Sequence, residues 1–363
     1  MNALARRIAG RIAEEGPLPV SQFMAAALGD PEGGYYVRGD PIGAQGDFIT
    51  APEVSQMFGE LIGLWCAAVW QSMGAPDPVT WIELGPGRGT LAADALRAVS
   101  KTAPTFAAAA DIHLVETSPV LREHQRTALP AGTTPTWHET VEDVPVGPIL
   151  VVANEFFDAL PIRQYVKSAE GWRERCIGLA GDGQRFAFAD VPCPPPDLPP
   201  ALASAHDGAV VEVCEAGVAI TGAIGERVAR DGGAALVIDY GHARSAPGDT
   251  LQAVRRHAFA DVLDRPGETD LTTHVDFEAL GNAATAAGAR VFGPVPQGVF
   301  LGRLGIEARA ATLARGADAD QTTAIHSALR RLAHPREMGL LFKVLAITGT
   351  VLGPPPGFDA PVR

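Results

Sequence analysis

The segment Ile-Glu-Leu-Gly-Pro-Gly-Arg-Gly, at residues 82–89, places an acidic side chain before three glycines at alternate positions. Glycine has no Cβ, so the backbone here turns tightly and comes close to a ligand. Residues 79–84 have the apolar, β-branched content of a short buried strand, and residues 90–96 have the composition of a helix. This pattern predicts a nucleotide-like cofactor at the N-terminus of a helix.

The spacing of the glycines indicates which nucleotide. A dinucleotide-binding enzyme such as a dehydrogenase needs Gly-x-Gly-x-x-Gly, and here residue 90 is Thr. Gly85, Gly87 and Gly89 alternate instead. This arrangement resembles motif I of the class I S-adenosylmethionine-dependent methyltransferases, in which such glycines face the cofactor.

Two acidic residues extend the predicted cofactor site. Glu83 lies two residues before the first glycine of the loop. In the class I methyltransferases that this motif resembles, the acidic residue at this position helps to hold the amino-acid end of the cofactor. A second predicted strand, residues 112–115, ends in Glu116. A carboxylate at that place accepts hydrogen bonds from both ribose hydroxyls.

Candidate catalytic residues follow two later strands. Glu155 and Asp158 come after the apolar run 149–153, and Asp239 and His242 lie at the end of the next one. Because ligands of open α/β sheets bind beyond the carboxyl ends of the strands, these side chains are expected on the cofactor's side.

Methyl transfer is an in-line displacement, so the enzyme chiefly aligns the nucleophile. If the nucleophile is a guanidinium nitrogen, carboxylates such as Glu155 and Asp158 hold its plane and its charge, and Asp239 with His242 receives the proton. Structural alternatives remain for single residues, because Asp158 also suits a helix N-cap and Asp239 a turn.

A further segment has two readings. Thr50 with Glu53 has the pattern of a helix start, with a proline in the first turn. The exposed amides of this segment, together with Asp47, are also placed to close over the methionine end of the cofactor. We therefore count Asp47 and Thr50 among the cofactor-binding residues.

Strand and helix signals alternate along the chain, which predicts an α/β fold with a mostly parallel, Rossmann-like sheet covered by helices on both faces. Six strands are expected, and residues 305–336 look helical. The expected units are a helical N-terminal cap (1–78), the core (79–162 and 208–300), an inserted β-hairpin (163–207), a helical insertion (301–340) and a terminal strand with a tail (341–363).

Bulk properties restrict the partners. The net charge of −13 disfavours nucleic acid and anionic membranes. The four cysteines lie far apart and suggest neither a disulfide framework nor a metal site, as expected for a reducing compartment. We find no apolar run of transmembrane length and no secretory signal.

Longer motifs identify the chain as resembling one family, the MidA-type methyltransferases. The segments that carry the resemblance are Gly46-Asp47-Phe48-Ile49-Thr50-Ala51-Pro52-Glu53, Glu83-Leu84-Gly85-Pro86-Gly87-Arg88-Gly89, Asn154-Glu155-Phe156-Phe157-Asp158-Ala159-Leu160-Pro161 and Asp239-Tyr240-Gly241-His242. This family is related to a mitochondrial complex I assembly factor that methylates an arginine.

The resemblance implies a class I fold, S-adenosylmethionine as cofactor, and symmetric dimethylation of an arginine on a protein partner such as a subunit of respiratory complex I. The composition and the lack of a recognisable transit peptide suggest a bacterial, cytoplasmic relative, whose target need not be the same. Two alternatives remain open at this point. The chain could be a scaffold that holds a partner without catalysis, or its nucleophile could be a small molecule.

Overall fold

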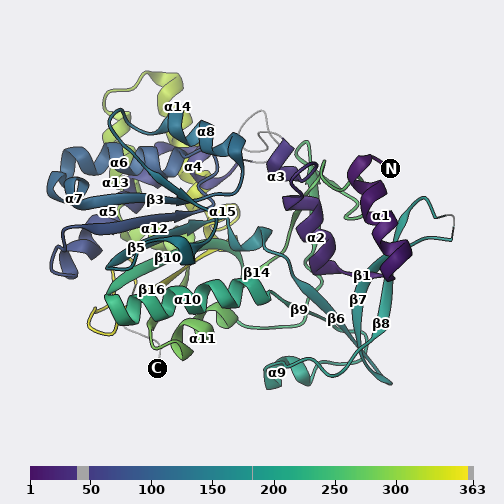
Figure 1. Ribbon diagram of the computed structural model, residues 1–363. Helices are drawn as coiled ribbons and strands as arrows, with labels where there is room; N and C mark the ends of the chain where they lie inside the picture. Colours follow the sequence, from purple (N-terminus) through teal and green to yellow (C-terminus); the bar gives the residue numbers. More distant parts are fainter. Residues whose placement is uncertain (39–48, 182, 359–363) are drawn as a thin grey trace.

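A computed structural model describes residues 1–38, 49–181 and 183–358 of the chain. Its central sheet has the strand order β15-β16-β10-β5-β2-β3-β4, with β14 paired to β10 (Figure 1). From β10 to β4 the neighbouring strands are parallel, whereas β16 is antiparallel to both β10 and β15. The predicted mostly parallel sheet is therefore confirmed. The strands are β2 Val79–Leu84, β3 Ala110–Val115, β4 Thr136–His138, β5 Ile149–Asn154, β10 Gly233–His242, β14 Val275–Asp276, β15 Arg290–Pro296 and β16 Phe342–Thr348.

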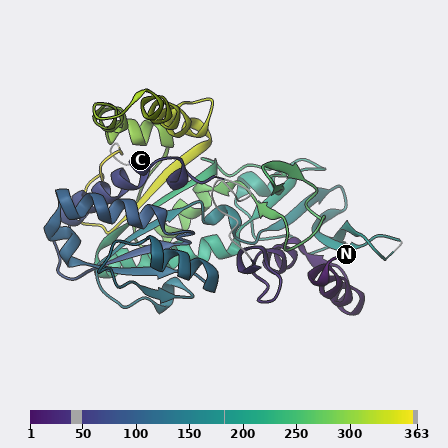
Figure 2. The same cartoon turned by 90° about the horizontal axis from the view of Figure 1, so that it is seen from above.

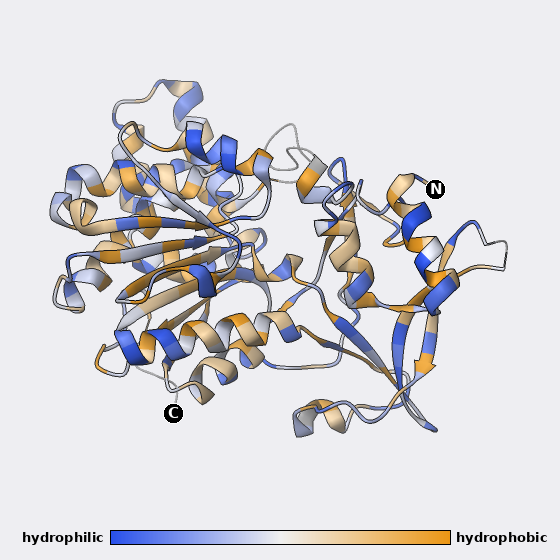
Figure 3. Cartoon of the chain, viewed as in Figure 1, coloured by the Kyte–Doolittle hydropathy of each residue, from blue (hydrophilic) through white to orange (hydrophobic). Residues whose placement is uncertain are grey.

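Helices cover both faces of this sheet because its strands are apolar on both sides. In β10, Leu236 and Ile238 face one hydrophobic cluster, and Ala235 and Val237 face the other. The apolar colouring of the inner strands in Figure 3 follows this burial. The main covering helices are α5 Gln56–Ser72, α6 Thr90–Thr102, α7 Pro104–Ala109, α8 Pro119–Ala128, α10 Glu215–Asp231 and α11 Phe277–Ala286.

A group of C-terminal helices stands on one side of the core, drawn in yellow-green in Figure 2. Its members are α12 Gln297–Arg303, α13 Ile306–Ala314, α14 Ala319–Ala333 and α15 Met338–Leu341. The group corresponds to the predicted helical insertion, although it begins at Gln297 rather than at residue 301.

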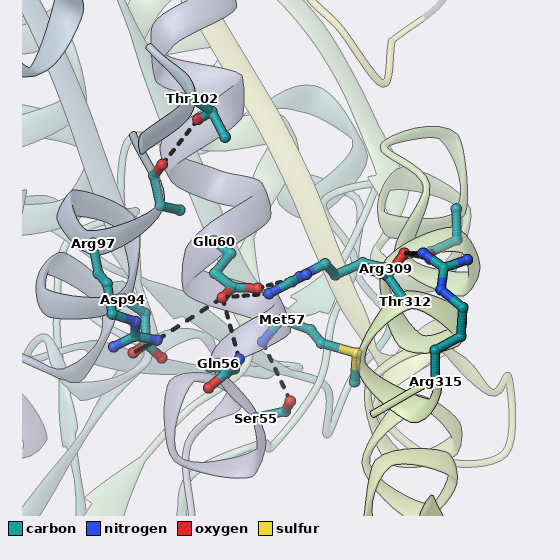
Figure 4. Close-up of polar contacts among 12 residues, drawn as sticks. Ser55, Gln56, Met57, Glu60, Asp94, Arg97, Thr102, Arg309, Thr312 and Arg315 are labelled. Carbon is teal, nitrogen blue, oxygen red and sulfur yellow. Dashed lines mark hydrogen bonds and ion pairs between the residues drawn. The ribbon is translucent and has the colours of Figure 1, made fainter. Parts of the chain in front are cut away.

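An ion-pair network ties this helical group to the core (Figure 4). The Arg309 guanidinium of α13 donates to both carboxylate oxygens of Glu60 in α5, at 2.6 and 2.9 Å. Glu60 is only 6% exposed, and Arg97 of α6 lies 3.9 Å from the same carboxylate. Because Glu60 is buried, these cations offset the cost of removing its carboxylate from water.

A second lobe is built on an antiparallel sheet of five strands, at the right of Figure 1. Leu4, Ile8 and Phe23 of its helices pack against Ile177 of the sheet in one hydrophobic cluster. The strands are β1 Leu18–Pro19, β6 Arg163–Ser168, β7 Gly171–Leu179, β8 Phe186–Pro192 and β9 Val210–Val213, and the packed helices are α1 Ala3–Glu15 and α2 Val20–Gly29.

Shorter elements complete the chain. The strands β11, β12 and β13 form a small antiparallel sheet, and Ala253 and Leu271 from it join the core of the second lobe. These short elements are β11 Gln252–Arg255, β12 Ala258–Ala260, β13 Asp270–Thr272, α3 Tyr35–Arg38, α4 Ala51–Val54, α9 Pro200–Ala203 and the 3-10 turns η1 Val141–Asp143 and η2 Phe157–Ala159.

The structure divides two predicted units differently. Residues 1–78 were expected to form one helical cap, but α1 and α2 belong to the second lobe whereas α5 packs against α6 of the core. The predicted hairpin is present as β7 and β8, yet it belongs to a larger sheet that β1, β6 and β9 complete. The amphipathic pattern of α1 shows that one face is buried, but not which distant element covers it.

In the described part of the chain, we find no helix that combines the length and the apolarity needed to cross a membrane.

We expect Arg309→Ala to lower the free energy of unfolding by about 1–3 kcal/mol, because it leaves the Glu60 charge buried with only the more distant Arg97 and Gln56 as partners. Arg315→Ala, in the same helical group, is the control. Arg315 donates to Thr312 on the surface, so its loss should change stability by less than about 0.5 kcal/mol. Urea unfolding followed by circular dichroism measures the free energy of unfolding of both variants. Equal values for Arg309→Ala and Arg315→Ala would contradict the role given to this network.

Candidate cofactor and methyl-transfer site

A cavity of about 490 Å³ opens at the carboxyl ends of β2, β3 and β5. Leu84, Val115 and Asn154, the last residues of these strands, all line it. Leu28 of α2 and Tyr36 of α3 line it as well, so the second lobe contributes to its wall. The cavity occupies the place where open α/β sheets bind their ligands.

The glycine loop supplies bare backbone to this cavity. Gly85, Gly87 and Gly89 have φ angles of 58°, 54° and 81°, which L side chains rarely adopt. A Cβ on Gly85 would also lie 2.8 Å from the ring of Phe156. Gly85 and Gly87 line the cavity as predicted, whereas Gly89 packs against Gln125 of α8 and is not among the lining residues.

Glu83 and Glu116 both line the cavity, as expected from the sequence. Burial raises the pKa of Glu83 to about 8. Burial also raises the pKa of Glu116, although hydrogen bonds from the Ser118 amide (2.8 Å) and the Gln125 side chain (3.2 Å) oppose this effect. These two donors fix the Glu116 carboxylate at the end of β3.

The lining residues fit S-adenosylmethionine. Glu83 is 4% exposed, and its Oε2 has no hydrogen-bond partner among the described residues. A buried acceptor without a donor matches the amino group of an amino acid. Glu116 offers a fixed carboxylate to a ribose, and the apolar side chains of Val115, Leu121 and Val141 suit a flat heterocycle.

The segment that contains Thr50 contacts the site directly. Thr50 lines the cavity, and the next amide, of Ala51, donates to Glu155 Oε1 at 2.8 Å. The Thr90 hydroxyl of α6 donates to Glu53 of α4. Thr50 is also the N-cap residue of α4, without a side-chain capping hydrogen bond, and its contact with the cofactor remains a prediction. Asp47, the other residue predicted in this segment, lies outside the described residues.

Glu155 is the predicted catalytic residue that the structure places in the cavity wall. Its φ of 50° lies in the left-handed region, which is unfavourable for a residue with a side chain. Its carboxylate accepts from Ala51 N at 2.8 Å and from Asn154 Nδ2 at 3.2 Å, both at Oε1. Burial raises the pKa of Glu155 to about 8.

Asp239 has a supporting place rather than a place in the cavity wall. It is fully buried, and Oδ2 accepts from the amides of Phe156, Phe157 and Asp158 at 3.2, 3.0 and 3.3 Å. Burial and the neighbouring charges of Asp158 and Glu155 raise its pKa well above the ordinary range. The geometry thus favours the turn-holding role that we left open from the sequence.

Asp158 and His242 also lie outside the cavity lining. Asp158 is 6% exposed, and its carboxylate is hydrogen-bonded to the Tyr240 hydroxyl behind the wall. His242 Nε2 lies 3.8 Å from Asp276 Oδ2 at the N-terminus of α11. The expected group of four catalytic residues is therefore not brought to one surface, since only Glu155 reaches the cavity.

The cavity is acidic, a property that the sequence did not reveal. Arg88 is the one basic side chain that lines it among the described residues. The negative potential of this lining favours cationic ligands. The lining carboxylates are Glu53, Glu83, Glu116, Glu139, Glu142 and Glu155.

Several lining residues were missed. Tyr36 comes from the second lobe, and its hydroxyl donates to the buried Asp270 of β13 at 3.1 Å. Glu139 and Glu142 follow β4, a strand of three residues that is too short to give a clear sequence signal. Asn154 stood in a recognised motif, next to Glu155, but no pattern distinguished its side chain as functional.

Known proteins resemble this chain over most of its length. The model of a family of S-adenosyl-L-methionine-dependent methyltransferases matches residues 61–295. The chain belongs to this methyltransferase family. The mitochondrial protein arginine methyltransferase NDUFAF7 homolog of Drosophila melanogaster is 37% identical over 96% of this chain and 86% of its own length. The mitochondrial protein arginine methyltransferase NDUFAF7 of Homo sapiens is 36% identical over 95% of this chain and 83% of its own.

The fold and the cofactor agree with a solved structure of the same architecture. A COG1565 superfamily protein from Burkholderia thailandensis, bound to S-adenosyl-homocysteine, superposes with a TM-score of 0.84 at 31% identity, over 99% of this chain and 93% of that one. The predicted class I fold and the predicted cofactor, S-adenosylmethionine, are thereby confirmed.

We expect Gly85→Ala to weaken binding of S-adenosylhomocysteine at least about tenfold, because the new Cβ meets Phe156 and the φ of 58° disfavours alanine. Isothermal titration calorimetry measures the affinity. Gly10→Ala is the matched control, since Gly10 lies in α1 with no atom within 4 Å of an added Cβ. This variant should bind S-adenosylhomocysteine with the affinity of the wild type. Unchanged binding in Gly85→Ala would remove the glycine loop from the site.

Proposed function

We propose that this protein methylates an arginine side chain of a protein partner and that Glu155 holds the target guanidinium. The observation that carries the proposal is the position of Glu155, whose carboxylate lines the cofactor cavity beside the glycine loop. The names of the relatives as protein arginine methyltransferases support the same class of target.

Electrostatics favours a cationic target. Six glutamates line the cavity with one arginine among the described residues, so the glutamates that are ionised attract a positive group. A guanidinium stays charged at all physiological pH values and offers five N–H donors in one plane. One edge of such a group matches a carboxylate, and the opposite nitrogen is then free to face the cofactor.

The reaction needs alignment more than activation. When bound, S-adenosylmethionine supplies a methyl group on a sulfonium sulfur, so that an N–C bond forms as the C–S bond breaks and its electron pair stays on sulfur. Glu155 orients the attacking nitrogen and localises the positive charge on the other nitrogens. The proton released from the attacking nitrogen passes to this carboxylate or to solvent. Asp239 keeps Glu155 in place through the turn that follows it.

The finer part of the proposal concerns the partner. We propose symmetric dimethylation of an arginine on a subunit of respiratory complex I or an equivalent bacterial protein, in support of its assembly. A cytoplasmic location remains our prediction for this chain, whereas the relatives are named as mitochondrial. Incubation of complex I subunits with S-adenosylmethionine labelled in its methyl group, followed by mass spectrometry, tests the target and the methylation pattern. Labelling of a small amine alone would favour a small-molecule enzyme, and binding without transfer would favour a scaffold.

We expect Glu155→Gln to reduce methyl transfer about 100-fold or more, because it removes the charge that holds the target cation. Binding of S-adenosylhomocysteine should change by less than about twofold, since the amide still fills the same space. The rate is measured with labelled cofactor, and the affinity by calorimetry.

The matched control for this substitution is Glu170→Gln, which removes an exposed carboxylate in the turn between β6 and β7. Its transfer rate should equal that of the wild type. Full activity in Glu155→Gln would disprove the assigned role, and an equal loss in both variants would show that only net charge matters.

The pH dependence of transfer follows from the raised pKa of Glu155, about 8. Below that value the carboxyl is largely protonated and neutral, so it cannot hold a cation. We therefore expect kcat/KM for the protein target to rise with pH, nearly tenfold per unit between about pH 6 and 7.5, and to level off above about 8. Measurement at saturating cofactor keeps the titration of Glu83 out of the profile. Glu155→Gln should lack this rise, and a flat wild-type profile would be incompatible with our assignment.

A further inference from the structure

We infer that Asn154 is a second target-binding residue, whose side-chain oxygen accepts an N–H of the guanidinium that Glu155 holds. This inference rests on the proposed function and adds a residue to it. Asn154 is the last residue of β5, lines the cavity and is 8% exposed. Its Oδ1 has no hydrogen-bond donor among the described residues.

The side-chain amide of Asn154 is oriented by a hydrogen bond from its nitrogen. Nδ2 donates to Glu155 Oε1 at 3.2 Å, the same oxygen that accepts from the Ala51 amide, so the bond matches an amide with its nitrogen toward Glu155. Backbone pairing fixes the position of the residue, since Asn154 lies opposite Ile238 of β10 and the next amide, of Glu155, donates to the Ile238 carbonyl at 2.9 Å. The oxygen is therefore held in place before any ligand arrives.

A buried acceptor without a donor is costly, so its presence in a cavity wall indicates a ligand that supplies the donor. The other buried side-chain atoms without partners form two groups. Glu83, whose Oε2 is one of these atoms, also lines the cavity, where the amino group of a bound cofactor would supply the donor. The remaining atoms belong to residues away from the cavity lining, among them Thr348 of β16.

Asn154 and Glu155 recognise different properties of a target. Glu155 attracts positive charge at long range, whereas a neutral amide oxygen contributes only through a directed hydrogen bond. Two acceptors on adjacent residues require a target with at least two N–H donors. A guanidinium meets this requirement in one plane, and a target nitrogen that carries a single N–H does not.

The test uses two ligands that do not depend on knowing the protein target. Both are analogues of S-adenosylhomocysteine in which nitrogen replaces sulfur and carries either a propylguanidinium arm or a butyl arm. The ratio of their dissociation constants measures the preference of the site for a guanidinium. In the wild type we expect the guanidinium analogue to bind at least about tenfold more tightly.

In Asn154→Ala we expect this preference to fall about 10- to 100-fold, while the affinity for S-adenosylhomocysteine stays within about twofold of the wild type. Asn154→Asp keeps an oxygen acceptor at the same place and should retain most of the preference. Thr348→Val is the control, because it removes another buried oxygen without a partner among the described residues, and Thr348 pairs with Ala234 near the amino end of β10, away from the cavity. Thermal melting confirms that each variant is folded.

The outcomes separate the two proposals. If the wild type shows no preference for the guanidinium arm, both the proposed target and the role of Asn154 are overturned. A preference that survives in folded Asn154→Ala overturns the role of Asn154 alone. Equal weakening of S-adenosylhomocysteine and of both analogues in Asn154→Ala would assign the residue to the cofactor and would also overturn the inference.

Discussion

The site depends on one buried carboxylate that accepts hydrogen bonds from the backbone amides of a turn. Asp239 of β10 accepts hydrogen bonds from three successive backbone N–H groups that follow Glu155. Because β10 and β5 are parallel neighbours, the carboxylate from one strand holds the chain that leaves the other. This contact offsets the unfavourable left-handed backbone of Glu155 and fixes a charged side chain in the cavity wall.

Carboxyl groups are concentrated where the ligands are expected to bind. The carboxyl groups of Glu83 and Glu155 have pKa values raised to about 8 by burial, so both groups are costly to ionise in the absence of a cation. A cationic cofactor and a cationic target reduce that cost. Their binding therefore favours the ionised form of these two carboxyl groups. Elsewhere a comparable buried carboxylate, Glu60, has permanent partners in Arg309 and Arg97. In the cavity, by contrast, the cationic ligands would supply the positive charge that Glu83 and Glu155 lack within the protein.

Much of the central sheet was predictable, because strands buried on both faces are continuously apolar and each is followed by a turn or a helix. The strands β2, β3 and β5 were all recognised, the last as residues 149–153, and the cavity lies at their carboxyl ends. The second lobe was not recognised as a unit. Its sheet joins β1, near the N-terminus, to strands about 150 residues later, and a short strand such as Leu18–Pro19 carries no periodic signal of its own.

The sequence by itself determined the cofactor loop and the family, because alternate glycines after a strand act locally, through backbone freedom and adjacent residues. It also singled out Glu155. Only the tertiary structure decided that Asp239 and Asp158 support the site from behind, that Tyr36 and Glu139 join its wall, and that the lining is acidic. The physical reason is that burial, the pKa of a carboxyl and the partners of a hydrogen bond depend on residues far apart in the chain, and no local pattern of residue types encodes them.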